Sequence, residues 1–309
     1  MTDDLLRFVE VAPRDGLQNA QATLSSDLKI ELCRRLMGAG VRHLEVGSFV
    51  SPHRVPQMAD SAAVVAGLGD AQGVELMALA PNRKGVERAL EFRINTVAVF
   101  VAASEGFAMA NTNCSIAECL ARAGEVIDAA RTAGRRSRGY VSCIAHCPFD
   151  GEVATDSVVR VAEALIGLGC DEIALGDTLG TTRPSDMRRL LAALAPSLPV
   201  ARIAVHCHDT YGMACASTLA AVDYGVRSVD GAVAGLGGCP FAPGAKGNAA
   251  SEDLVFMLEG LGMRTGIDLD ALALTGEWIS RHLAVPNASR TGSAMGARRD
   301  VASWRSRSR

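Results

Sequence analysis

The sequence lacks the features that would assign it to a membrane protein or a nucleic-acid-binding protein. No stretch approaches the roughly 20 apolar residues that a membrane-spanning helix needs. A large positive charge is also missing, because 31 lysines and arginines stand against 34 acidic residues, giving a formal net charge of -3 and a sequence pI near 6.1. We therefore expect neither a nucleic-acid partner nor a membrane partner.

The marks of a secreted protein are missing as well. The first residues, MTDDLLRFVEVAPRDG, are acidic and contain no long apolar core, so we expect neither a signal peptide nor a transit peptide. The nine cysteines are odd in number and stand singly within apolar stretches, which indicates reduced, buried thiols rather than a disulfide framework. We expect a cytoplasmic protein.

What the sequence does have is a regular alternation of two patterns. Short apolar runs typical of buried strands recur eight times, at residues 6–13, 42–49, 74–81, 95–104, 138–145, 171–178, 201–209 and 228–237. Segments with the helical spacing of apolar residues separate them. Eight alternating units predict an α/β protein with a closed (β/α)8 TIM barrel. A doubly wound open sheet is disfavoured, because no G-x-G-x-x-G motif follows the first run.

The length of the chain fits one such barrel. We expect residues 1–290 to form a single catalytic domain, since α/β barrels commonly reach this size. A short helical extension ends the barrel, and residues 291–309 form a polar, basic tail for which we leave disorder open.

Two histidines, His206 and His208, end the seventh run in the motif HCHDTYG. Side chains two residues apart on a strand point to the same face, so both imidazoles should face the barrel axis while Cys207 faces the helices. This geometry alone leaves a metal site and a hydrogen-bonded structural pair equally open.

Other predicted strands bring further polar groups to the same mouth, because catalytic groups of TIM barrels lie at the C-terminal ends of the strands. Asp15 follows the first run and Asn248 follows the eighth, so two oxygen ligands can join the histidines. A mixed nitrogen and oxygen set favours Mg²⁺ or Mn²⁺ over a structural zinc ion. The remaining polar residues at this mouth are Arg14, Glu45, Ser48, Asp177 and Asp209.

Six motifs, taken together, resemble one known family. They are VEVAPRDGLQN (9–19), SFVSPHRVPQMADS (48–61), YVSCIAHCPFDG (140–151), EIALGDTLGTTRP (172–184), HCHDTYGMA (206–214) and AGLGGCPFAPGAKGNAASEDLVFML (234–258). In this order they resemble 3-hydroxy-3-methylglutaryl-CoA lyase, from about residue 7 to about residue 290. The resemblance implies a metal-dependent carbon–carbon lyase that splits this thioester into acetyl-CoA and acetoacetate, in leucine degradation.

The resemblance also implies roles for single residues. It makes Asp15, His206, His208 and Asn248 the ligands of a divalent ion, Mg²⁺ or Mn²⁺. Arg14, beside one of these ligands, would hold the thioester oxygen as enolate charge develops.

Three further catalytic assignments follow from the resemblance. Cys239 lies in a glycine-rich loop and would protonate the acetyl-CoA carbanion. Glu45 and Asp177 correspond to active-site carboxylates, which would either handle protons or orient the histidines. Capping of a barrel end is the alternative for both carboxylates.

The acyl-CoA contacts implied by the resemblance are Arg14, Gln18, Asn111 and Ser115. The segment around Asn111 lacks the lysines that we would expect beside it, and Met109 and Ala110 stand there instead. The contacts to the CoA phosphates would therefore come from other residues, such as Arg54 or Lys246.

Other functions stay open beside this one. The first is a lyase for a related tertiary 3-hydroxyacyl-CoA. The second is an acetyl-CoA-dependent condensing acyltransferase of the isopropylmalate synthase kind, which has no need of Cys239. The third is a barrel that only binds its ligand, which is disfavoured because every implied metal ligand is present. We expect a homodimer.

Overall fold

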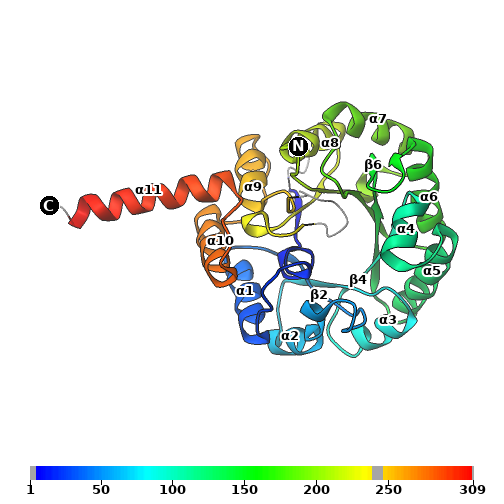
Figure 1. Ribbon diagram of the computed structural model, residues 1–309, viewed down its shortest axis with the longest axis horizontal. Coiled ribbons are helices and arrows are strands. Elements are labelled where there is room, and N and C mark those ends of the chain that lie inside the picture. Colours follow the sequence, from blue (N-terminus) through cyan, green and yellow to red (C-terminus); the bar gives the residue numbers. More distant parts are fainter. Residues whose placement is uncertain (1–4, 239–245, 308–309) are drawn as a thin grey trace.

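The computed structural model describes residues 5–238 and 246–307, and its centre is a closed barrel of eight parallel strands (Figure 1). The strands follow one another around the barrel in the order β1-β10-β9-β8-β5-β4-β3-β2. They are β1 (Arg7–Glu10), β2 (His43–Ser48), β3 (Glu75–Leu79), β4 (Thr96–Ala102), β5 (Arg136–Ser142), β8 (Glu172–Asp177), β9 (Ile203–Cys207) and β10 (Ser228–Gly231). Each overlaps one predicted apolar run, so the (β/α)8 barrel is confirmed.

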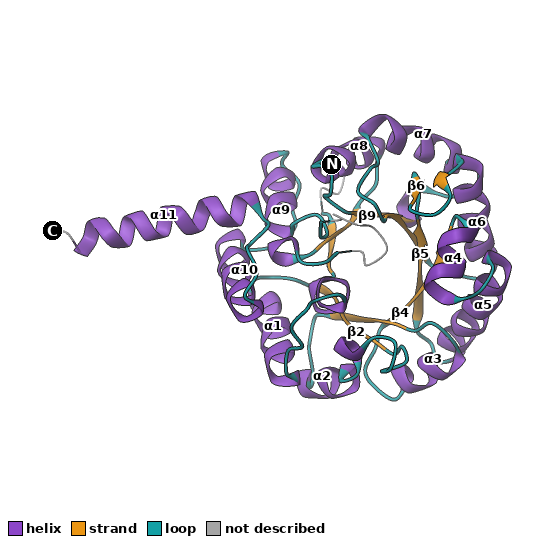
Figure 2. Ribbon diagram, viewed as in Figure 1, coloured by secondary structure: helices purple, strands orange, loops and turns teal. Residues whose placement is uncertain are grey.

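Helices surround the barrel on its outer side (Figure 2). They are α1 (Ser26–Gly38), α2 (Ser61–Leu68), α3 (Arg83–Leu90), α4 (Glu105–Thr112), α5 (Ile116–Thr132), α6 (Thr155–Gly167), α7 (Pro184–Leu194), α8 (Ala214–Tyr224), α9 (Ser251–Gly260) and α10 (Leu269–Leu283). A two-stranded hairpin, β6 (His146–Cys147) with β7 (Gly151–Glu152), lies between β5 and α6. Within the described residues, no helix has the length and apolarity that a membrane crossing requires.

The main hydrophobic core lies between the strands and the helices. Leu32 and Leu36 of α1 are fully buried, as are Val126 and Ile127 of α5. Leu32 and Leu36 are four residues apart and lie on one face of α1, and Val126 and Ile127 are neighbours on one face of α5. Both faces turn toward the barrel. Burial of each such side chain is worth about 1.5–3 kcal/mol, so this layer holds the helices in place.

The inside of the barrel is less uniform than in most TIM barrels, where branched apolar side chains fill it. One part is apolar and consists of Leu79, Ala98, Tyr140, Ala174 and Ala204, with Phe100 packed against them. The other part is a connected set of ion pairs made by Arg7, Glu75, Arg138, Glu172 and Asp230. Charged side chains therefore reach from the bottom of the barrel toward its C-terminal mouth.

The expected C-terminal helical extension is present, and the tail for which disorder was left open is helical over its described part. The backbone is helical over α11 (Arg290–Arg307), which projects away from the barrel (Figure 1). Asp253 of α9 accepts hydrogen bonds from the backbone N–H groups of Arg290 and Thr291, at 3.2 and 2.7 Å. This carboxylate satisfies donors that the first turn of a helix leaves free. The composition of residues 291–309 could not reveal a cap supplied by another helix.

Candidate metal centre

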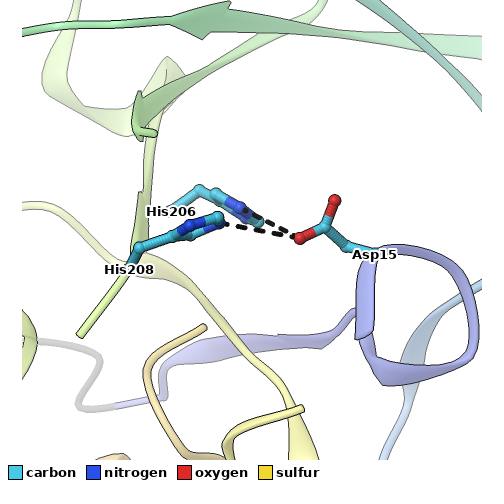
Figure 3. A group of neighbouring side chains, drawn as sticks. All are labelled: Asp15, His206 and His208. Carbon is cyan, nitrogen blue, oxygen red and sulfur yellow. Dashed lines mark ion pairs between the residues drawn. The ribbon is translucent and has the colours of Figure 1, made fainter. Parts of the chain in front are cut away.

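Asp15, His206 and His208 meet at the C-terminal mouth of the barrel (Figure 3). Their ligand atoms all lie within 4.8 Å of one another. The Oδ2 atom of Asp15 is 3.8 Å from Nε2 of His206 and 3.7 Å from Nε2 of His208. Both histidines are buried, and the three side chains converge as the sequence pattern predicted. The cluster is a possible metal site.

The local backbone explains this convergence. His206 lies in β9 and His208 just beyond its end, so the two-residue period of the strand turns both imidazoles inward. Asp15 lies in the wide helical turn η1 (Ala12–Gly16), whose N–H groups at Asp15 and Gly16 both donate to the carbonyl of Val11. This turn brings Asp15 back over the mouth of the barrel.

Neighbouring charges keep Asp15 ionised. Burial would raise the pKa of this carboxyl, but the Arg14 guanidinium and the two histidines outweigh burial and hold the pKa well below its ordinary value. An ionised carboxylate beside two imidazoles is a set of ligands that binds divalent cations.

Asn248 lies next to the cluster and is buried. Its Nδ2 atom donates to Oδ2 of Asp15 and to the carbonyl of Leu236, both at 2.9 Å. The amide nitrogen, not the oxygen, thus faces Asp15, and ligation would require the oxygen to take that position. Gly237 has a φ of +129°, and a Cβ atom there would lie 2.5 Å from Nδ2 of Asn248. Glycine at this position allows the two segments to approach.

Arg14 connects the cluster to Glu45. The guanidinium forms ion pairs with Asp15 and, at 2.7 Å, with Oε2 of Glu45, while Tyr140 donates from its hydroxyl to the same Oε2 at 3.1 Å. The Arg14 guanidinium also lies 5.2 Å from the centre of the Tyr140 ring. Burial would lower the pKa of Arg14, but the two carboxylates raise it, so the side chain stays charged. The structure therefore brings Glu45 to Arg14, rather than to a histidine.

Asp177 lies at the end of β8, and its side chain binds backbone N–H groups of the following loop. Its carboxylate accepts hydrogen bonds from the N–H groups of Thr181 and Thr182, at 3.1 and 2.9 Å. Burial raises the pKa of Asp177 despite these hydrogen bonds. The described contacts match the capping alternative, and no hydrogen bond between Asp177 and a histidine appears among them.

Asp230, which was not among the predicted site residues, contacts His206. Oδ2 of Asp230 lies 3.1 Å from Nδ1 of His206. Burial alone would raise the pKa of Asp230, but the charge of Arg138 and the contact with His206 lower it. Asp230 pairs in register with His206 across β9 and β10. An aspartate inside the short apolar run at 228–237 was the signal that could have revealed it.

A cavity of about 720 Å³ opens at this mouth, and its walls differ. Arg14, Asp15, His206 and His208 line one side, which we call the charged wall. Val55, Leu79, Phe100 and Phe107 line another, which we call the apolar wall. In the ring of eight strands, β3 and β4 stand across the barrel from β9 and β10. Leu79 of β3 and Phe100 of β4 therefore lie across the barrel from His206 of β9.

Of the residues expected to bind substrate, Gln18 and Asn111 line the cavity together with Arg14. The Oε1 atom of Gln18 is buried and has no hydrogen-bond partner among the described residues. Ser115 is not among the residues that line the cavity. It begins α5 instead, where its hydroxyl accepts from the N–H of Glu118 and its own N–H donates to that glutamate.

Two further residues, Arg54 and Lys246, were expected to contact the CoA phosphates. Arg54 is exposed and lines the cavity, whereas Lys246 is exposed and is not among the lining residues; its backbone N–H donates to the Thr210 hydroxyl. Cys239 lies outside the described residues. Gly238, just before it, accepts a hydrogen bond from the Nδ2 atom of Asn19 at 2.9 Å.

The barrel and its Asp-His-His cluster define the class first: a TIM-barrel protein with a possible metal site at the C-terminal end of its strands. Residues 5–279 match the family model HMGL-like, and the chain belongs to the HMGL-like family. The predicted resemblance is confirmed.

Curated relatives cover nearly the whole chain. The hydroxymethylglutaryl-CoA lyase of Pseudomonas mevalonii is 51% identical over 95% of this chain and 97% of its own length. The 3-hydroxy-3-isohexenylglutaryl-CoA/hydroxy-methylglutaryl-CoA lyase of Pseudomonas aeruginosa is 49% identical over 94% of this chain and 97% of its own.

Solved structures agree with these relatives. The hydroxymethylglutaryl-CoA lyase of Pseudomonas aeruginosa superposes with a TM-score of 0.93 at 48% identity, over 96% of this chain and 98% of that one. An HMG-CoA lyase of Acinetobacter baumannii, solved with coenzyme A and 3-methylmalate, gives a TM-score of 0.91 at 35% identity, over 95% and 96% of the two chains.

Proposed function

We propose that this protein is a divalent-metal-dependent lyase that cleaves 3-hydroxy-3-methylglutaryl-CoA into acetyl-CoA and acetoacetate. The observation that carries the proposal is the Asp15, His206 and His208 cluster on the wall of a cavity large enough for an acyl-CoA thioester. The relatives that cover the whole chain are lyases of this name. The products would suit a place in leucine degradation.

The charges inside the barrel support a divalent ion. Three arginines are joined by ion pairs to five carboxylates, so two negative formal charges remain when the histidines are neutral. Buried charge of one sign is costly unless it is compensated. A single divalent cation at the cluster would balance it. The residues in this sum are Arg7, Arg14, Arg138, Asp15, Glu45, Glu75, Glu172 and Asp230.

The kind of ligand narrows the choice of ion. One carboxylate, two imidazoles and the amide of Asn248 make a set of two nitrogens and two oxygens without a thiolate, which favours Mg²⁺ or Mn²⁺. When bound, such an ion lowers the pKa of a hydroxyl and neutralises the charge of an oxyanion.

The chain's own groups then have distinct tasks in breaking the bond between C2 and C3. The 3-hydroxyl loses its proton to solvent, C3 becomes the ketone of acetoacetate, and the bonding electron pair moves to the acetyl-CoA enolate. Arg14 holds the enolate oxygen, and Glu45 with Tyr140 fixes the guanidinium in place. Cys239 delivers a proton to C2 of the enolate.

Substrate binding would use the cavity around these groups. Gln18 offers an unpaired buried oxygen, and Asn111 an amide on the wall of the cavity. Arg54 is a cation on the same wall and would contact a CoA phosphate. We assign Ser115 an indirect role, since its hydroxyl is engaged in starting α5.

The test is an assay of purified protein with 3-hydroxy-3-methylglutaryl-CoA, after removal of metal and again with Mg²⁺ or Mn²⁺ added. We expect acetoacetate and acetyl-CoA in equal amounts, and only when metal is present. Absence of product with both ions would contradict the proposal. Preferred condensation of acetyl-CoA with a keto acid would favour an acyltransferase instead.

The apolar wall favours a second candidate, cleavage of a 3-hydroxyacyl-CoA with a longer apolar branch at C3. Val55 and Phe100 are only partly buried at the cavity, so a longer apolar branch would cover surface there that a methyl group leaves exposed. One Pseudomonas aeruginosa relative carries both the isohexenyl and the methyl substrate in its name. Comparing kcat/KM for the methyl and isohexenyl thioesters decides between a narrow and a broad substrate range.

A further inference from the structure

The two histidines of the cluster differ in what lies behind them. Nδ1 of His206 is 3.1 Å from Oδ2 of Asp230, and both side chains are buried. Nδ1 of His208 is buried too, but it has no hydrogen-bond partner among the described residues. Only one of the two imidazoles is therefore held by an anion on the side away from Asp15.

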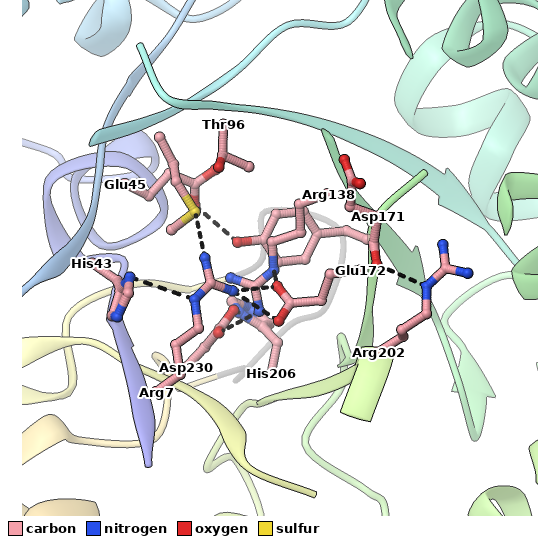
Figure 4. Close-up of polar contacts among 12 residues, drawn as sticks. Arg7, His43, Glu45, Thr96, Arg138, Asp171, Glu172, Arg202, His206 and Asp230 are labelled. Carbon is pink, nitrogen blue, oxygen red and sulfur yellow. Dashed lines mark hydrogen bonds and ion pairs between the residues drawn. The ribbon is translucent and has the colours of Figure 1, made fainter. Parts of the chain in front are cut away.

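Asp230 is held in turn by an arginine. Nη2 of Arg138 donates to Oδ1 of Asp230 at 2.7 Å, which leaves Oδ2 for His206. Arg138 is fully buried and forms a second ion pair with Glu172 at 2.9 Å. Figure 4 shows these side chains converging inside the barrel. The two carboxylate oxygens of Asp230 thus have different and fixed partners.

The same set of ion pairs continues to the far end of the barrel. Glu172 binds Arg7 at 2.6 Å (Figure 4). Arg7 in turn binds Glu75 at 2.9 Å. Glu75 contacts His43 at 3.0 Å and takes no part in the cluster at the mouth. The network therefore contains one carboxylate that touches a proposed metal ligand and another, similarly paired, that does not.

We propose that Asp230 is a positioning residue that fixes the tautomer of His206, with Arg138 fixing the orientation of Asp230. This inference rests on the proposed metal-dependent function. An anionic oxygen at Nδ1 keeps the proton on that nitrogen, and the lone pair of Nε2 then points toward Asp15 and the proposed ion.

The substitution Asp230→Asn reverses this arrangement. An amide beside Arg138 must turn its oxygen toward the guanidinium, because two donors cannot face each other. The amide NH₂ group then donates to Nδ1 of His206 and forces the proton onto Nε2. A protonated Nε2 has no lone pair for a metal. An isosteric change that adds no bulk should therefore weaken metal binding.

The matched control is Glu75→Gln. It also converts a carboxylate of the network into an amide, and it removes one anion from Arg7 as Asp230→Asn removes one from Arg138. If the network acts only through stability, both variants should behave alike. If Asp230 fixes the tautomer, Glu75→Gln should unfold more easily than the wild type and still bind metal normally.

The experiment is calorimetric titration of the metal-free protein with Mn²⁺, for the wild type and both variants. We expect Asp230→Asn to bind about 10–100-fold more weakly, with Glu75→Gln within about twofold of the wild type. Equal affinity of Asp230→Asn and Glu75→Gln would overturn the proposal.

A second measurement needs no variant, so it tests the tautomer of His206 even if Asp230→Asn does not fold. Nitrogen-15 NMR of the imidazoles in the metal-free wild type should show the proton of His206 on Nδ1. A proton on Nε2 would overturn the proposal. Neither measurement uses substrate, so a wild type that binds Mn²⁺ but cleaves no thioester would contradict the proposed function alone.

Discussion

The side chains of the charged wall and those of the apolar wall are held in place by different kinds of contact. On the charged wall nearly every group has a fixed partner: Arg14 holds Asp15 and Glu45, and Asp230 holds His206. On the apolar wall, the side chains of Leu79 and Phe100 are placed by packing against apolar neighbours. Charged groups that must be placed to within a fraction of an ångström need hydrogen bonds that fix their side chains. Walls that only shape a cavity do not.

A second contrast lies among the buried carboxylates. Glu172 and Asp230, inside the barrel, are paired with arginine, and the pKa of each is lowered despite burial. Glu10 and Glu252, between the strands and α9, accept hydrogen bonds from backbone N–H groups, and the described ion pairs include neither. Burial raises the pKa of Glu10 to about 7 and that of Glu252 to about 8. A cation, rather than a hydrogen bond, decides which buried carboxylates stay ionised.

The largest expected effect is on the charged wall, at a proposed metal ligand. His206→Ala removes one of two imidazoles, so metal binding and lyase activity should both be lost. Acetoacetate release should fall to the level of a sample without enzyme, and Mn²⁺ titration should show no heat of binding. Activity that survives this change would mean that His206 is a structural residue.

Arg14→Gln tests the same wall and leaves all four proposed ligands in place, while it removes the ion pair to Asp15. Loss of one fixed donor to a developing oxyanion costs about 10²–10³-fold in kcat. We expect this loss while Mn²⁺ binding is retained, because the four proposed ligands remain. Arg14→Lys should restore only part of the rate, because an ammonium group cannot span Asp15 and Glu45 as the planar guanidinium does. Full activity of Arg14→Gln would remove Arg14 from the mechanism.

The contrast between carboxylates predicts a pH dependence of stability. Because the pKa of Glu252 is higher in the folded protein than in the unfolded chain, the folded state binds more protons, and the free energy of unfolding should fall as pH rises from about 5 to about 8. Glu252→Gln should flatten this fall by a few kcal/mol at most. Chemical denaturation at three pH values measures it, and an equal slope in both proteins would show that Glu252 does not titrate in this range.

The smallest effect is expected on the apolar wall. Val55 is partly buried at the cavity, so Val55→Phe can fill space there without breaking the main core. The variant should lower kcat/KM for an isohexenyl thioester by about tenfold, the size expected for a poor fit of a few carbons. The rate with the methyl substrate should change little. An equal loss of kcat/KM with both substrates would mean that this wall does not discriminate between substrates by their branch at C3.

Much of the fold could be predicted because its signals are local. Eight apolar runs give eight strands, and the two-residue period of β9 turns His206 and His208 to one face. Asp15 could be joined to them because strand ends of a TIM barrel share one mouth.

The supporting contacts could not be predicted, because they join residues far apart in the chain. Nothing near Glu45 reveals that Arg14 and Tyr140 will meet its carboxylate. Asp177 and Ser115 were expected at the active site, but polar residues at strand and helix ends also serve as caps, and both have capping contacts here. Sequence patterns give the face of a residue but not its partner across the barrel.

The central claim is that one divalent ion on the charged wall supports the cleavage. Its most direct test is to strip the protein of metal and follow acetoacetate release from 3-hydroxy-3-methylglutaryl-CoA while Mn²⁺ is added back. We predict no release without metal and full activity at one ion per chain, with Asp15→Ala inactive throughout. Full activity of the stripped protein, or none at any Mn²⁺ concentration, would contradict the claim.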